Sequence, residues 1–155
     1  MVKEKINKTE KIAKVNAPQI NVSKKYAIAI CKFIKNKNPE KMIEKLKLVQ
    51  EKKKAVPMHA EVPHKHNMPK GQVAGRYPVK ASGIFIKLLK SLIANASNLG
   101  LNEKELIINI AMANKAPSQF RGTRMAYGRK KFKRCHVYLE AKQMKEKKII
   151  GEKIK

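Results

Sequence analysis

One stretch of the chain carries far more positive charge than a protein core can accommodate. Residues 115–136 read KAPSQFRGTRMAYGRKKFKRCH, with eight Lys or Arg and no acidic residue. Two segments typical of strands flank this stretch, ELIINIAMAN before it and VYLEA after it. A hairpin normally needs about two to five loop residues, so a loop of roughly twenty would be abnormal. Either the strands continue inward as a long ribbon, or the stretch is a disordered basic loop.

The charge of the whole chain calls for a partner of opposite sign. Lys and Arg total 37 against 11 acidic residues, all of them Glu, and the formal net charge is +26. Nucleic acid is the densest source of counter-charge, because phosphates line its backbone and binding releases counterions. An anionic membrane surface is the competing source. Since 43% of the residues are hydrophobic, too many for a wholly disordered tail, we expect a folded core.

The sequence also argues against several locations and cofactors. It contains no run of apolar residues long enough to span a membrane, and its N-terminus lacks the apolar stretch of a secretory signal. Cys31 and Cys135 lie far apart, and neither has a CxxC partner. We therefore expect buried, reduced thiols in a cytosolic chain, with no disulfide, metal or cofactor.

Two helices are predicted in the first third of the chain. Ser23, a good N-cap, precedes a helical stripe of apolar residues over Lys24–Lys35. An Asn-Pro pair at 38–39 then begins a second helix in the favoured way. We expect this helix to reach residue 53 or 54, because a proline soon follows.

The most regular helical pattern follows Pro78. Gly83 near its start is a mild cost that close packing would explain. Gly100 stands where a C-terminal glycine belongs. The stripe expected to face the core comprises Ile84, Phe85, Leu88, Leu89, Leu92, Ile93 and Leu99.

Strands are predicted on both sides of the basic stretch. LIINIAMAN alternates and is rich in β-branched residues, and Cys135, Val137 and Leu139 alternate with polar residues in FKRCHVYLEA. AKVNAPQINVS, broken by Pro18, suits an edge strand or an extended lead-in. The predicted class is α+β: a small three-stranded antiparallel sheet packed by three helices, with a long protruding β-hairpin.

The expected organisation is one domain with charged ends. Residues 1–12 form a basic N-terminal extension, 13–141 a single α+β domain with a hairpin at about 106–140, and 142–155 a basic C-terminal tail. Between Ala55 and Pro78 no apolar period remains, which predicts a long loop. The three histidines of this loop, His59, His64 and His66, match no common zinc spacing, so we expect them to be solvated or to contact RNA.

Enzymatic function is not supported by the residues present. The chain has no Asp, and its Glu residues are scattered over positions expected to be exposed, so no carboxylate pair suggests acid–base chemistry. No glycine-rich phosphate loop or G-x-S-x-G turn occurs. The adjacent Cys135 and His136 would point to opposite faces of a strand, which is wrong for a nucleophile and its base.

The basic stretch has the composition of an RNA-binding arm. Arginine engages phosphate through two parallel donors, and aromatic rings stack on unpaired bases. Such a two-stranded ribbon is not stable alone and would persist when embedded in a partner. The candidate RNA-binding residues of the arm are Arg121, Arg124, Arg129, Lys130, Lys131, Lys133 and Arg134, interleaved with Phe120, Tyr127 and Phe132.

Several segments follow one another in an order that is typical of one protein family. They are SKKYA (23–27), the Asn-Pro start of the second helix, VP (56–57), GRYPVKAS (75–82), NLGL (98–101) and AYGRKKFKRCH (126–136). Together they resemble the universal large-subunit ribosomal protein family twenty-two in its archaeal and eukaryotic branch. The resemblance covers roughly Val15 to Ala141. It departs from the family at T-R-M-A-Y-G-R, where the family often has M-P-R-A-x-G-R.

This resemblance implies a structural role in the cytoplasmic ribosome. A small body would lie on the outer surface of the large subunit, and the hairpin would run through 23S-type rRNA to the wall of the nascent-peptide exit tunnel. The implied partners are that rRNA, neighbouring large-subunit proteins and the nascent polypeptide near the hairpin tip, with no membrane and no small-molecule substrate. Arg129 matches the family's Arg after Gly, and the segments resembling its rRNA-facing surface contain Lys24, Lys25, Arg76 and Lys80.

Two other functions are compatible with the charge alone. One is a free-standing, chromatin-type nucleic-acid binder, and the other is a protein that binds anionic membranes. Both should dissociate as salt rises, whereas a ribosomal protein should stay with large subunits.

Overall fold

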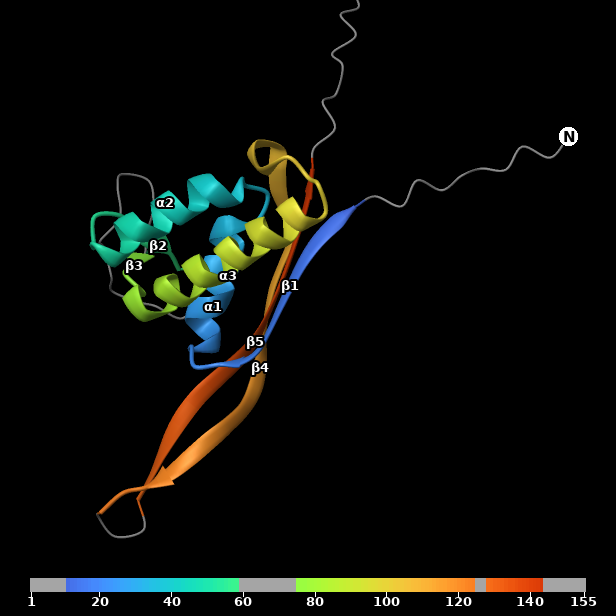
Figure 1. Ribbon diagram of the computed structural model, residues 1–155. Coiled ribbons are helices and arrows are strands. Elements are labelled where there is room, and N and C mark those ends of the chain that lie inside the picture. The colour runs from blue at the N-terminus through green and yellow to red at the C-terminus, as the bar shows by residue number, and fades with distance from the viewer. Residues whose placement is uncertain (1–10, 59–74, 125–127, 144–155) are drawn as a thin grey trace, which may run out of the picture.

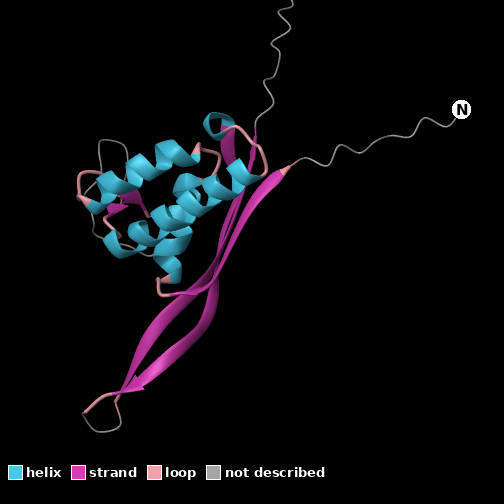
Figure 2. Ribbon diagram, in the orientation of Figure 1, coloured by secondary structure: helices cyan, strands magenta, loops and turns pink. Residues whose placement is uncertain are grey.

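The computed structural model describes residues 11–58, 75–124 and 128–143 (Figure 1). Three helices gather on one side of a sheet, and a hairpin of two long strands extends beyond them (Figures 1 and 2). The elements in chain order are β1 (Ile12–Ile20), α1 (Lys24–Ile34), α2 (Pro39–Gln50), β2 (Val56–Pro57), β3 (Gly75–Arg76), α3 (Val79–Asn98), the 3-10 helix η1 (Glu103–Glu105), β4 (Leu106–Gly122) and β5 (Arg129–Gln143).

The main sheet is antiparallel with the strand order β1-β5-β4. Of the strands in the described residues, the last in sequence is therefore the central strand of this sheet. β1 pairs along one side of β5 from Ile12↔Lys142 to Ile20↔Cys135, and β4 pairs along the other side as far as Gly122↔Arg129. The predicted α+β class, the three-stranded sheet with its three helices and the long hairpin are confirmed, as is β1 as an edge strand.

The core lies between the helices and one face of the sheet. Cys135, Val137 and Leu139 are fully or almost fully buried, and the residues between them on β5 are half-buried. This alternation is the one expected for a sheet covered on a single side. The helices contribute most of the largest fully buried side chains, namely Ile30, Ile34, Met42, Leu46, Val49, Phe85, Leu89 and Leu92.

Two helices end in left-handed turns that the structure shows in detail. After α2, Lys52 has φ +60°, and the Lys53 N–H donates to the Leu48 carbonyl over 2.9 Å. This closing motif ends the helix at Gln50, so the expected end at residue 53 or 54 is wrong. After α3 the same motif uses Gly100, with φ +71°, and this confirms the predicted C-terminal glycine.

Two further features differ from the sequence prediction. Leu99 lies beyond α3 and is 40% exposed, because the closing turn carries it off the buried stripe. The ends of the predicted 55–78 loop pair as a two-residue ladder, β2 with β3, and residues 59–74, with their three histidines, lie outside the described part.

Gly83 packs closely against the end of α2. A Cβ atom added there would lie 3.0 Å from Nε2 of Gln50, the far end of a flexible, exposed side chain. Because that amide can move aside and glycine weakens a helix, Gly83→Ala should raise the free energy of unfolding by about 0.5–1 kcal/mol. Urea titration of the isolated protein measures this change. If Gly83→Ala instead lowered stability, the contact between α2 and α3 would be unable to relax. Adding Gln50→Ala should then produce the expected gain in stability.

The two free thiols are buried, as predicted. Burial, with a smaller contribution from the neighbouring Cys135, raises the pKa of Cys31 to about 12, and burial also raises that of Cys135. The folded protein should therefore react with a disulfide reagent at about pH 8 far more slowly than in concentrated urea.

The same pKa shift makes stability depend on alkaline pH. As pH rises above the ordinary thiol pKa of 9.0, the unfolded chain loses the Cys31 proton while the folded chain keeps it. Stability should consequently fall between about pH 9 and pH 12. The Cys31→Ala, Cys135→Ala double variant reports the background from lysine titration, and an equal slope in both proteins would contradict the prediction.

Candidate RNA-binding surface

The outer arm consists of residues 119–122 of β4 and 129–132 of β5. These residues pair in register, Gln119 with Phe132 through Gly122 with Arg129. All are exposed except Phe132, which is half-buried. The Thr123 N–H and hydroxyl both donate to the Gly128 carbonyl, at 2.8 and 3.0 Å, and so extend the ladder into the turn. The arm is thus a regular ribbon held by backbone hydrogen bonds, with little apolar surface of its own to bury.

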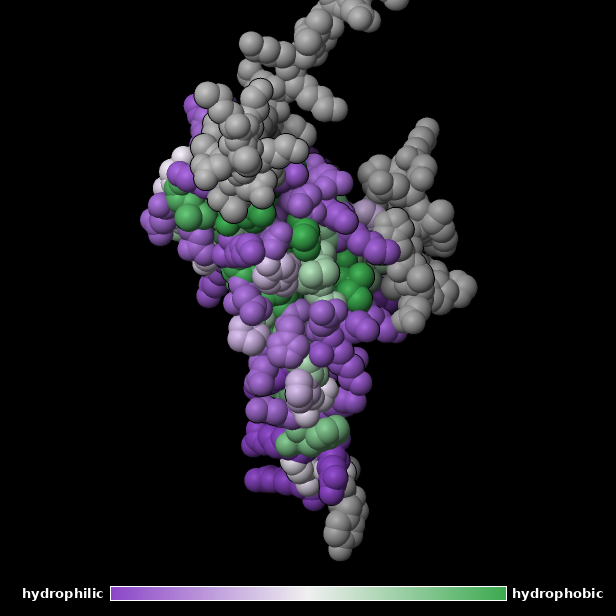
Figure 3. All heavy atoms as spheres, turned by 90° about the vertical axis from the view of Figure 1, so that its right-hand side faces the viewer, coloured by the Kyte–Doolittle hydropathy of each residue, from purple (hydrophilic) through white to green (hydrophobic). Residues whose placement is uncertain are grey.

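Charge is sharply segregated along the molecule. No acidic residue occurs from Leu106 to Leu139, whereas the described acids lie on or next to α2, in η1 and at Glu140. Figure 3 shows hydrophilic residues over most of the lower half of the molecule, with the hydrophobic surface mainly on the upper body. Positive charge on the arm is therefore not neutralised by nearby carboxylates, and it attracts polyanions.

Exposed aromatic surface accompanies this charge. Phe120 is 61% exposed, and the ammonium group of its cross-strand partner Lys131 lies 5.6 Å from the ring centroid. The cation holds the ring against the ribbon only weakly at such an exposed site. A ring and an ammonium group side by side can meet a base and its phosphate together.

At the root of the arm, both outer strands bulge at a proline. β1 bulges at Pro18 and Gln19, opposite His136 of β5, and β4 bulges at Pro117 and Ser118, opposite Lys133. Proline lacks a ladder donor and is suited to such positions. The Arg134 guanidinium donates there to the side-chain oxygens of Gln19 and Gln119, which joins both flanking strands to β5. Arg134 thus has a bracing role in addition to its predicted contact with RNA.

The candidate residues of the body begin the helices or lie beside them. Lys24 and Lys25 are exposed in the first turn of α1, and Lys80 is exposed in the first turn of α3. Arg76 on β3 is half-buried, with Nη1 donating to the Tyr26 hydroxyl over 2.9 Å and the guanidinium 5.9 Å from that ring. Arg76 therefore ties β3 to α1.

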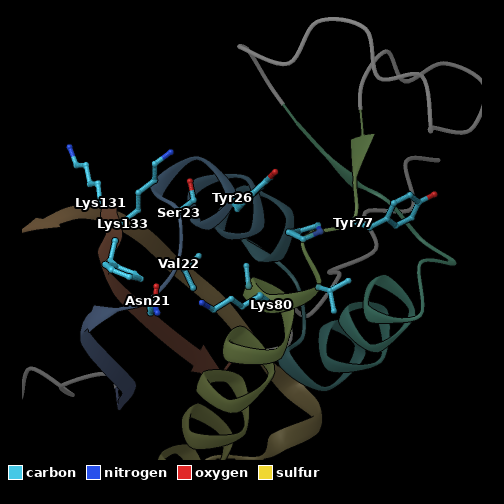
Figure 4. A pocket seen from close by; sticks show the side chains of 12 residues that line it. Asn21, Val22, Ser23, Tyr26, Tyr77, Lys80, Lys131 and Lys133 are labelled. Carbon is cyan, nitrogen blue, oxygen red and sulfur yellow. The ribbon is translucent and has the colours of Figure 1, made fainter. Parts of the chain in front are cut away.

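A cleft of about 490 Å³ lies where the arm meets the body. Lys131 and Lys133 extend from β5 on one side of it, Tyr26 belongs to α1, and Lys80 lies at the start of α3 (Figure 4). The complete lining is Asn21, Val22, Ser23, Tyr26, Tyr77, Pro78, Val79, Lys80, Ala81, Lys131, Phe132 and Lys133.

The structure thus brings together some of the predicted residues and separates others. Lys80, Lys131 and Lys133 share the cleft, whereas Arg121, Arg124, Arg129 and Lys130 lie exposed further along the arm and its turn. Tyr127 lies outside the described residues. Sequence patterns did not single out Tyr26 and Tyr77, although each adjoins basic residues in a segment that carries the family resemblance.

Other chemistry finds little support in the described part of the chain. Over those residues no group of three His, Cys, Asp or Glu side chains could hold a metal ion. No described helix combines the length and the apolar character needed to cross a membrane. Among the described residues, the basic arm and the cleft at its root are the features best suited to binding a partner.

Comparison with known proteins agrees with this picture. Residues 15–140 match the family described as Ribosomal protein L22p/L17e. The chain is 35% identical to the large ribosomal subunit protein uL22 of Methanoregula boonei over 71% of its own length and 73% of that protein. It is 40% identical to the uL22 of Methanoculleus marisnigri over 68% and 70%, and 36% identical to that of Archaeoglobus fulgidus over 77% and 78%. The chain belongs to the ribosomal protein L22p/L17e family, in its archaeal branch.

Proposed function

We propose that this protein is a structural component of the large ribosomal subunit that binds 23S-type rRNA and supports subunit assembly. The observation that carries the proposal is the outer arm, a ribbon exposed on nearly all its surface and free of acidic residues. Its relatives are proteins of the large ribosomal subunit. The protein therefore acts in the cytoplasm, within the ribosome, and has no catalytic role.

Physical chemistry explains why the partner of the arm is RNA. An isolated two-stranded ribbon is marginal in water, and this one also carries uncompensated like charges. Phosphates around the ribbon neutralise the cations and release counterions. The predicted contacts of the arm, from Arg121 to Arg134, follow the ribbon along its whole exposed length, and those of the body are Lys24, Lys25, Arg76 and Lys80.

The length of the arm supports a position of its outer end deep inside the subunit. A strand of 17 residues spans up to about 55 Å at 3.3 Å per residue, and the arm is its outer part. We propose that the turn at 123–128 reaches the wall of the nascent-peptide exit tunnel, with neighbouring ribosomal proteins around the body. The nascent polypeptide would then pass close to Arg124, which is exposed in that turn.

The salt dependence of binding distinguishes this protein from a free-standing nucleic-acid binder and from a membrane binder. In a sucrose gradient of cell lysate, the protein should comigrate with large subunits even in moderately high salt, because it is embedded among many contacts. A loosely bound polycation should dissociate, since its affinity falls steeply with salt. Finding the protein at the top of a low-salt gradient would contradict the proposal.

Charge reversal on the arm tests the rRNA contact. The double variant Arg121→Glu, Arg129→Glu should fold, because both side chains are exposed. Its incorporation into large subunits should fall at least about tenfold, since two phosphate contacts become repulsive. Quantitative mass spectrometry of gradient fractions measures the incorporation.

A matched control has the same change in charge on a different surface. Lys41→Glu with Lys47→Glu alters two exposed lysines of α2, which lies away from the arm (Figure 1). This variant should be incorporated nearly as well as the unmodified protein. Equal losses in both variants would mean that net charge, rather than the arm, determines incorporation.

A further inference from the structure

The cleft at the root of the arm joins three segments that are far apart in the sequence. Its lining comes from the start of α1, from the turn into α3 and from residues 131–133 of β5 (Figure 4). These are parts of SKKYA, GRYPVKAS and AYGRKKFKRCH, which are among the segments that carry the resemblance to the family. Three of the segments that together carry the resemblance therefore meet around one cleft.

The lining of the cleft is apolar and aromatic, with cations as its only charged groups. Val22, Pro78 and Ala81 are buried, and the half-buried rings of Tyr26 and Phe132 add flat apolar surface. Three exposed lysines, Lys80, Lys131 and Lys133, add positive charge from two sides, and the lining includes no acidic residue. This combination suits a ligand with a flat apolar part and an anionic part.

The two helices that begin at the cleft strengthen its positive potential. Neither α1 nor α3 has an acidic residue in its first turn, and neither receives a hydrogen bond from a capping side chain. Ser23 occupies the N-cap position of α1 without making that bond. The positive ends of both helix dipoles therefore reinforce the field of the three lysines.

We propose that this cleft receives one unpaired nucleotide of the large-subunit rRNA. Its base lies against the rings of Tyr26 and Phe132, and its phosphates face Lys80, Lys131 and Lys133. The proposal rests on rRNA binding as the function and adds a specific site and a specific kind of ligand. A volume of about 490 Å³ lies within the range of roughly 300–1,000 Å³ typical of pockets for small organic ligands, a class that includes a single nucleotide.

An unpaired nucleotide fits this cleft better than the other polyanions considered. A paired base lies within its stack and presents only its edge, so it cannot lay its face on an aromatic ring. An acidic peptide would satisfy the lysines, but its carboxylates have no flat ring system to cover Tyr26 and Phe132. A lipid headgroup would also leave these rings without a stacking partner.

Ultraviolet crosslinking of intact large subunits tests the site directly. Irradiation joins a base to an aromatic side chain that it contacts, and mass spectrometry of the digested protein identifies the residue. We expect a nucleotide attached to Tyr26 or Phe132. Crosslinks confined to other residues, or a chemical crosslink from Lys80 to a neighbouring protein that fills the cleft, would overturn the proposal.

Two variants of the full chain test the energetics with full-length large-subunit rRNA from the source organism. Phe132→Leu keeps an apolar side chain but removes the ring, and it should weaken binding about fivefold or more. Phe33→Leu is its control, because Phe33 is a half-buried ring of α1 that does not line the cleft. Lys80→Gln should reduce the slope of log affinity against log salt by about 0.7–0.9, and Lys90→Gln on the same helix should leave the slope unchanged.

The outcomes separate this site from the general function. If the unmodified protein fails to bind the rRNA, both proposals fail. If the unmodified protein binds and Phe132→Leu and Lys80→Gln behave as their controls do, rRNA binding stands and the nucleotide cleft is overturned. Circular dichroism of each variant identifies any loss of fold, and in that case the crosslink alone decides.

Discussion

The antiparallel ladder between β4 and β5 is the constraint on which the molecule depends. Its inner part is anchored by Val137 and Leu139, which are buried beneath the helices. Its outer part has hydrogen bonds but almost no apolar burial, so that part is stabilised chiefly by continuation from the inner part. One pair of strands therefore serves as core structure at one end and as an exposed, charged arm at the other.

The transition between these two parts is built from local chemistry. β1 bulges at a proline opposite His136 of β5, and β4 bulges at a proline opposite Lys133. Between these two positions, the Arg134 guanidinium joins the strands through two glutamines. The cleft with its lysines lies near this junction, which also includes the starts of α1 and α3. The body thus meets the basic arm where backbone irregularity, positive potential and aromatic surface coincide.

Sequence reasoning predicted the parts of the fold that follow local rules. The apolar stripe of α1 and the alternation around Cys135 depend on periodicity, which neighbours in sequence determine. The end of α2 was missed because Lys52, not glycine, takes the left-handed position, and residue type alone does not indicate this. The short β2–β3 ladder has only two residues a side, too few for any period.

The candidate site also has one part that the sequence predicts and one part that it does not. The charged arm is visible in the sequence because its residues are contiguous, so composition alone indicates a polyanionic partner. The cleft is assembled from segments at least fifty residues apart. One of its aromatic residues, Tyr26, looks like an ordinary member of a helix until the tertiary structure places it in one cleft with Lys131. The bracing role of Arg134 likewise depends on Gln19, a partner 115 residues away.

The strand order β1-β5-β4 has a consequence for how the chain can be made. The central strand is synthesised after both of its neighbours, and these two strands have no partner in the sheet before it emerges. Ile12 can pair only after Lys142 has been synthesised, so closing the sheet brings together the two ends of the described chain. Such distant pairings make folding slow. The helices can pack together early, but the sheet, and with it the arm, is completed only after β5 has been synthesised.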